Sequence, residues 1–208
     1  MTTDPILPRP TRRTLLTGAA ALMLLATPAR ATTEAEARAL VDAVARELTD
    51  IVNSGGGQAQ MIARFEGVFD RFADMPVIAR SVLGPVARSA SAAQLRRFTQ
   101  VYRGYLARKY GRTLFGGYVG GEIGVTGVRQ SGTVYSVQSV ARMRRRTGGT
   151  ERLDVVWQVS SRSPEARFFN MIIDGVNFFA IEREEVPAML DARGGSLDRL
   201  IADLPGLG

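Results

Sequence analysis

The chain contains neither cysteine nor histidine, and these two absences exclude most of the chemistry by which a small protein acts as an enzyme. Without cysteine there can be no disulfide, thiolate metal ligand or thiol nucleophile. Without histidine there can be no Ser-His-Asp triad, imidazole-bound zinc or imidazole general base. An enzyme would depend on carboxylates alone, for example Asp154 with Asp174. We therefore expect a protein that is not an enzyme and needs no cofactor and no metal.

Lysine is almost absent as well, since Lys109 is the only one and arginine supplies the remaining positive charge. The net charge is +7; residues 1–31, with four arginines and one aspartate, supply +3 of it and leave about +4 for the rest. A surplus of this size suits contact with an anionic membrane surface and does not call for nucleic acid as a partner.

A long apolar run that could cross a bilayer is also missing. Residues 1–31 instead read as an export signal: the pair Arg12-Arg13, a weakly apolar stretch to Ala26, and the small-x-small site Ala29 to Ala31. The alternatives are an uncleaved anchor helix and, for the route, the twin-arginine or the general pathway. We predict a periplasmic protein, cleaved near Ala31, whose residues 32–208 form one domain.

Apolar residues recurring every three or four positions predict helices in the first half of the mature chain. The predicted ranges are 34–52, 58–73, 76–83 and a long helix from a capping box at Ser91 and Gln94 to about Leu114. Asp74 is a candidate cap for the third helix.

From Tyr118 onward, glycines and alternating β-branched residues predict antiparallel strands. Residues 142–150 resemble a hairpin tip, Val155 to Val159 alternate, and a run from Arg167 to Ile181 is broken only by Asp174-Gly175. Short helices are predicted at 184–190 and 197–204. The expected fold is α+β: N-terminal helices packed on one face of a curved four- to five-stranded antiparallel sheet, with short C-terminal helices.

Two regions together resemble the MlaC family of periplasmic phospholipid-binding, or toluene-tolerance, proteins. The first is Leu83-Gly84, then Gln94, then aromatic and leucine residues at four-residue steps: Phe98, Tyr102, Leu106 and Tyr110. The second is Phe169-Asn170-Met171 followed by Asp174-Gly175-Val176-Asn177 and the closing L-x-x-L-I-x-x-L segment. The chain departs from the family pattern at Pro85-Val86 and Asn170, which leaves open a relative tuned to another lipid, such as the hopanoid-associated branch.

The resemblance implies a lipid carrier that takes part in outer-membrane lipid asymmetry and exchanges phospholipid between an inner-membrane transport complex and an outer-membrane lipoprotein complex. Such a carrier needs a dry slot lined by apolar side chains. The candidates, which would otherwise be ordinary core residues, are Val82, Leu83, Tyr102, Tyr105, Leu106, Val125, Val137, Val155, Trp157, Met171, Ile173, Val176 and Phe178.

The densest run of charge is Arg142, Arg144, Arg145 and Arg146, here named the arginine tip. It is a candidate for transient docking on a membrane surface or on a partner complex, and the alternative is a solvated hairpin. For Asp174 and Asn177 we expect roles in turn geometry. A protein-only adaptor of an envelope complex remains the alternative to a lipid carrier.

Overall fold

The computed structural model describes residues 31–208. The predicted export signal therefore lies, apart from Ala31, outside the described residues. Within that range no helix is both long enough and apolar enough to cross a membrane.

The predicted helices of the first half are all present. They are α1 (Glu34–Val52), α2 (Gln58–Phe72), α3 (Met75–Leu83) and α5 (Ala92–Gly117). The short α4 (Val86–Ser89), which the sequence did not predict, lies between α3 and α5. The capping box that starts α5 is confirmed, because the Ser91 hydroxyl accepts from Gln94 N at 3.1 Å and Ser91 N donates to the Gln94 side chain at 3.0 Å. Asp74 caps α3 by accepting from Val77 N.

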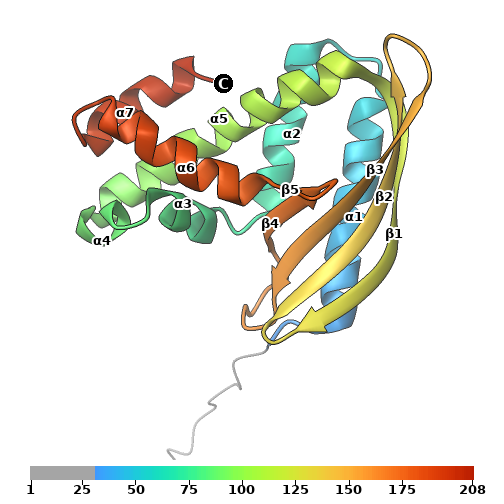
Figure 1. Ribbon diagram of the computed structural model, residues 1–208, viewed down its shortest axis with the longest axis horizontal. Coiled ribbons are helices and arrows are strands. Elements are labelled where there is room, and N and C mark those ends of the chain that lie inside the picture. Colours follow the sequence, from blue (N-terminus) through green and yellow to red (C-terminus); the bar gives the residue numbers. More distant parts are fainter. Residues whose placement is uncertain (1–30) are drawn as a thin grey trace, which may run out of the picture. The chain divides into compact units, whose positions relative to one another are not determined.

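The second half begins with a five-stranded antiparallel sheet in the order β1-β2-β3-β4-β5. Its strands are β1 (Tyr118–Ser131), β2 (Val134–Arg145), β3 (Thr150–Ser160), β4 (Phe168–Ile173) and β5 (Val176–Asn177). A bulge between Val125 and Gly127 shifts the β1–β2 register, and the long strands curve around the helices (Figure 1). The α+β prediction is thus confirmed.

One predicted boundary is wrong. The run to Ile181 was expected to stay extended, whereas helix α6 (Phe178–Asp191) starts directly after β5. The Asn177 side chain accepts from Ala180 N at 3.1 Å and caps this helix. Its buried residues, Glu182, Val186 and Leu190, recur at four-residue steps. A helical period was therefore present in the sequence, but the aromatic and β-branched residues before it masked it. Helix α7 (Leu197–Asp203) and a 3-10 turn, η1 (Leu204–Gly206), complete the chain.

Alternation along the strands assigns one face of the sheet to the core. On β3, Val155, Trp157 and Val159 are buried and face the helices, as do Val137 and Ala141 on β2. The buried indole of Trp157 donates to the Ser139 hydroxyl at 2.9 Å, so a polar group sits in this apolar layer without losing its partner. Helix α1 covers β1, α2 packs on α5, and α3 packs on α5 and α6 (Figure 1).

Candidate functional site

An apolar hollow of about 90 Å³ lies between the inner face of the sheet and helices α1, α2 and α5. We name it hollow A. Its buried floor is formed by side chains that are almost inaccessible, namely Phe65, Val68, Phe69, Val155, Trp157 and Phe168. Its remaining lining includes the half-buried side chains Leu114, Ile123, Leu153, Met171 and Ile173. These half-buried residues come from the end of α5 and from strands β1, β3 and β4, and they mark where the hollow approaches the surface.

A second hollow of about 50 Å³, hollow B, adjoins the first along α5. It lies between α3, α5, β4 and the start of α6, and Tyr102, Leu106, Tyr110, Phe178 and Phe179 contribute to its wall. Hollows A and B share Phe69, Phe168 and Met171. Those three side chains form the partition between them. Together the hollows trace one apolar slot interrupted by the partition.

The structure brings seven of the thirteen predicted slot residues to the hollows. Val155, Trp157, Met171 and Ile173 line hollow A, while Tyr102, Leu106, Phe178 and again Met171 line hollow B. The other six line neither hollow: Val82, Leu83, Tyr105 and Val137 are buried in the core, Val125 is half-buried, and Val176 is 49% exposed.

Sequence reasoning missed the contribution of α1 and α2 to the slot. Leu48 and Val52 from α1, and Phe65, Val68 and Phe69 from α2, form much of hollow A. The periodicity of these residues predicted buried helix faces, but no signal in the sequence indicated which of those faces would pack against the sheet. Phe168 was also missed, although it packs edge-on against Trp157 with ring centroids 5.2 Å apart.

A buried polar cluster joins α5 to α6 beside hollow B. The Glu182 side chain is only 4% exposed and accepts hydrogen bonds from Tyr102 Oη at 2.7 Å, from Lys109 Nζ at 2.6 Å and from Tyr110 Oη. Lys109 also pairs with Glu185 and lies over the ring of Tyr110. The carboxylate is therefore fully partnered, as a buried charge must be.

The cluster shifts the acid–base behaviour of its members. Burial, followed by the nearby charge of Glu182, raises the pKa of Tyr102 and of Tyr110 above the ordinary value of 10.0. Burial lowers the pKa of Lys109, but its hydrogen bonds to Glu182 and Glu185 outweigh this and raise the pKa overall. Tyr110 also packs edge-on against Phe178, with ring centroids 4.7 Å apart. The cluster thus fixes the position of an aromatic side chain in the wall of hollow B.

The four residues of the arginine tip have different surroundings. Arg142 pairs with Glu122 at 3.2 Å and Arg145 pairs with Glu151 at 2.7 Å. Arg146 donates to the carbonyls of Phe115 and Gly116, where it satisfies the last turn of α5. Of the four, only the Arg144 side chain has no hydrogen bond or ion pair with another residue in the range 31–208.

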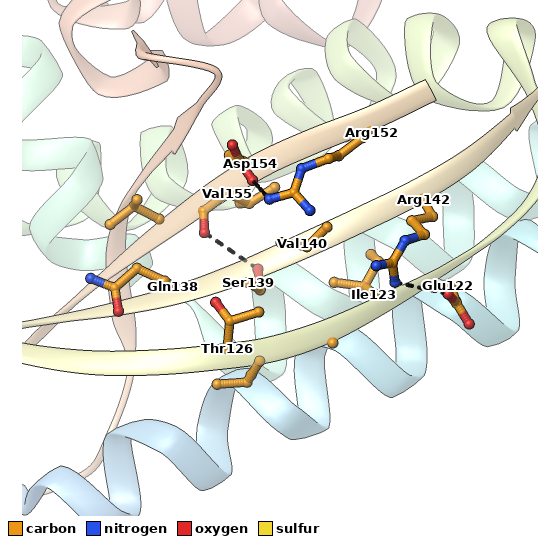
Figure 2. Close-up of a pocket in the computed structure, with 13 residues that line it drawn as sticks. Glu122, Ile123, Thr126, Gln138, Ser139, Val140, Arg142, Arg152, Asp154 and Val155 are labelled. Carbon is orange, nitrogen blue, oxygen red and sulfur yellow. Dashed lines mark hydrogen bonds and ion pairs between the residues drawn. The ribbon is translucent and has the colours of Figure 1, made fainter. Parts of the chain in front are cut away.

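The outer face of the sheet carries a shallow depression of about 600 Å³. Figure 2 shows its charges in pairs, Arg142 with Glu122 between two strands and Arg152 with Asp154 along β3. The carboxylates considered for acid–base catalysis have structural partners: Asp154 binds Arg152 at 2.7 Å, and Asp174 accepts from Asp154 N at 2.8 Å. Asp174 occupies the left-handed turn region (φ 48°) and Asn177 caps α6, which agrees with turn roles for both.

Fold and site together define a class: a small α+β protein whose curved sheet and helices enclose an apolar slot. The chain belongs to the MlaC family, because the family model described as MlaC protein matches residues 26–205. Comparison with curated proteins finds no significant match. Among solved structures, the chain resembles a phospholipid-binding protein from Ralstonia solanacearum in complex with a phospholipid. The TM-score is 0.63 and the identity 16%, over 81% of this chain and 94% of that one. At this identity the likeness establishes the fold.

Proposed function

We propose that the chain is an exported, non-enzymatic carrier that holds the acyl chains of a phospholipid in the slot formed by hollows A and B. The observation that carries the proposal is that the lining of both hollows is almost wholly apolar, in a protein of the MlaC family. The phospholipid-bound relative of the same fold supports the choice of ligand. Its cellular setting would be the periplasm, reached after removal of the segment up to about Ala31.

Energetics favour a carrier over a tight receptor. Burying acyl chains gains about 0.8 kcal/mol per methylene relative to water, so about thirty methylenes gain over 20 kcal/mol. A bilayer offers nearly the same gain. The protein therefore needs only to match a membrane, and transfer between membranes requires neither a nucleophile nor a metal. We propose that it exchanges lipid with an inner-membrane transport complex and an outer-membrane lipoprotein complex through transient surface contacts.

The test is mass spectrometry of lipid extracted from protein purified without detergent. Val155 lines hollow A, whereas Val137, on the inner face of the neighbouring strand, lines neither hollow. We expect the wild type to carry phospholipid, Val155→Trp to lose most of it, and Val137→Trp, the matched control, to keep it when it folds. Overpacking costs about 1–3 kcal/mol, so unfolding is monitored for both variants by circular dichroism.

Folded wild-type protein without any lipid would contradict the carrier and favour a protein-only adaptor. If the extracted lipid is a polycyclic triterpenoid and not a phospholipid, the slot remains the binding site but the proposed ligand is wrong. If Val155→Trp and Val137→Trp both fold and lose lipid equally, the lipid is not bound in hollow A.

A further inference from the structure

A second surface feature is lined by residues of α3, α4 and the first half of α5, together with the end of α2 and Arg167. Figure 1 shows where these helices lie. Two depressions, of about 650 and 510 Å³, adjoin there and share Arg80, Ala92 and Leu95. We name their union the arginine groove. The arginine groove and the slot share no lining residue, although both use residues of α5.

The arginine groove carries a strong excess of positive charge. Five arginines line it against two carboxylates, Asp70 and Asp74; the arginines are Arg80, Arg88, Arg96, Arg103 and Arg167. Arg103 pairs with Asp70 and with Glu66. Arg167 donates to the carbonyl of Asp70 at 3.2 Å and pairs with Glu165 at 3.4 Å. These two arginines are therefore engaged within the fold.

The other three arginines are available to a ligand. Arg80, Arg88 and Arg96 are exposed, and none has a carboxylate oxygen within 4.0 Å among residues 31–208. The groove's other carboxylate, Asp74, is occupied as the cap of α3. The three guanidinium groups therefore do not form ion pairs that stabilise the fold of residues 31–208.

The three arginines come from three different helices that border the arginine groove. Arg80 on α3 lines both depressions, Arg88 in α4 lines the smaller one, and Arg96 on α5 lines the larger one. Between them, small or buried apolar residues such as Ala87, Ala92 and Leu95 form part of the lining. A guest would meet three exposed guanidinium forks and a partly apolar surface between them.

We propose that the arginine groove binds an acidic segment of a partner protein, with carboxylates paired to Arg80, Arg88 and Arg96 and small side chains on the floor. Arginine forks suit carboxylates because they bind both oxygens at once. A concave surface suits a protruding segment better than it suits the plane of a bilayer. This goes beyond the lipid carrier, since it assigns a protein-docking site that does not use the slot.

The experiment uses the full mature chain and a fluorescently labelled peptide of alternating Glu and Ala, with binding followed by anisotropy at low salt. The groove variant is the triple change Arg80→Gln, Arg88→Gln and Arg96→Gln. The matched control is Arg129→Gln, Arg162→Gln and Arg199→Gln, which removes the same charge from exposed arginines outside the groove.

We expect the groove variant to bind the peptide about tenfold more weakly, since each exposed pair contributes a few-fold and the effects multiply. The control variant should change binding less than twofold. Replacing the three groove arginines with lysine keeps the charge and should still weaken binding, because the bidentate geometry is lost. Both glutamine variants should keep their bound lipid.

Equal weakening in the groove and control variants would overturn the proposal, because it would mean general attraction to a basic protein. No binding of the peptide by wild type would overturn it too. In a parallel arm with phosphatidylglycerol vesicles, loss of vesicle binding by the groove variant with unchanged peptide binding would identify a membrane contact instead. Lipid content is measured separately, so failure of the carrier and failure of the groove give different results.

Discussion

The buried carboxylate of Glu182 offers a sharp test of how α6 is held against α5. Three donors converge on its two oxygens: Tyr102 Oη on Oε2, and Lys109 Nζ and Tyr110 Oη on Oε1. In Glu182→Gln an amide NH₂ group replaces one of these oxygens. Whichever way the amide turns, the hydroxyl hydrogen of one tyrosine loses its acceptor, and the surviving hydrogen bonds lose the help of the negative charge.

The size of the effect follows from this geometry. A buried donor left without an acceptor costs about 1–3 kcal/mol, and hydrogen bonds to a charged group are about 1 kcal/mol stronger than neutral ones. Lys109 keeps Glu185 as a partner, which moderates the loss. We therefore expect Glu182→Gln to lower the free energy of unfolding by about 3 kcal/mol, within the range for breaking a buried ion pair.

Urea unfolding is the assay, and an unchanged m-value would show that the loss lies in stability rather than in the compactness of either state. Glu185→Gln is the matched control, because the Glu185 side chain is 44% exposed and its pair with Lys109 is at the surface; it should cost less than about 1 kcal/mol. If Glu182→Gln cost no more than Glu185→Gln, the reasoning about converging donors would be refuted.

Three further predictions concern other parts of the chain. Because the pKa values of Tyr102, Tyr110 and Lys109 are raised on folding, the unfolded chain releases these protons first, and stability should fall as the pH rises above about 10. Tyr110→Phe should flatten that fall in pH-dependent unfolding, and an equal slope would contradict the assignment. Replacing all four residues of the arginine tip with Gln should weaken co-sedimentation with anionic vesicles at low salt and leave bound lipid unchanged. An exposed arginine near the membrane contributes about 1 kcal/mol, and the Arg144 side chain is unpaired within residues 31–208, whereas Arg142 and Arg145 are partly neutralised by their carboxylate partners. Equal vesicle binding by both proteins would leave the tip as a solvated hairpin. Changing Arg12 and Arg13 to Lys should leave the precursor in the cytoplasm, and periplasmic, processed protein in a fractionation experiment would favour the general export route.

The sequence was most informative where one local signal dominated. Helix α5 was predicted because the Ser91–Gln94 capping box and a regular apolar stripe agree, and β3 because Val155, Trp157 and Val159 alternate with residues on the outer face. It misled at Phe178, where a strand-like composition hid the start of α6. There the decisive element is the cap at Asn177, a single side chain that pattern reasoning had taken for part of a turn.

The slot was predictable only on one side. Strand alternation assigns Val155, Trp157 and Ile173 to the inner face without any knowledge of the fold. Which helix faces oppose them depends on how α1 and α2 cross the sheet, and that is set by long-range packing rather than by periodicity. The Glu182 cluster was hidden for the same reason, since its partners lie more than seventy residues away along the chain.

The dimensions of the slot bear on how a carrier releases its cargo. Hollows A and B measure about 90 and 50 Å³, whereas pockets for small-molecule ligands usually measure about 300–1,000 Å³. Accepting acyl chains therefore requires the walls to separate and the partition of Phe69, Phe168 and Met171 to move. Met171 is half-buried and has a flexible side chain, so of the three partition residues it can change its rotamer with the smallest loss of free energy. In the proposed carrier, the work of opening would be subtracted from the gain of burying the acyl chains, so the affinity for lipid would stay near that of a bilayer. A slot that was permanently open would hold lipid more tightly and give it up less readily, which would defeat transfer.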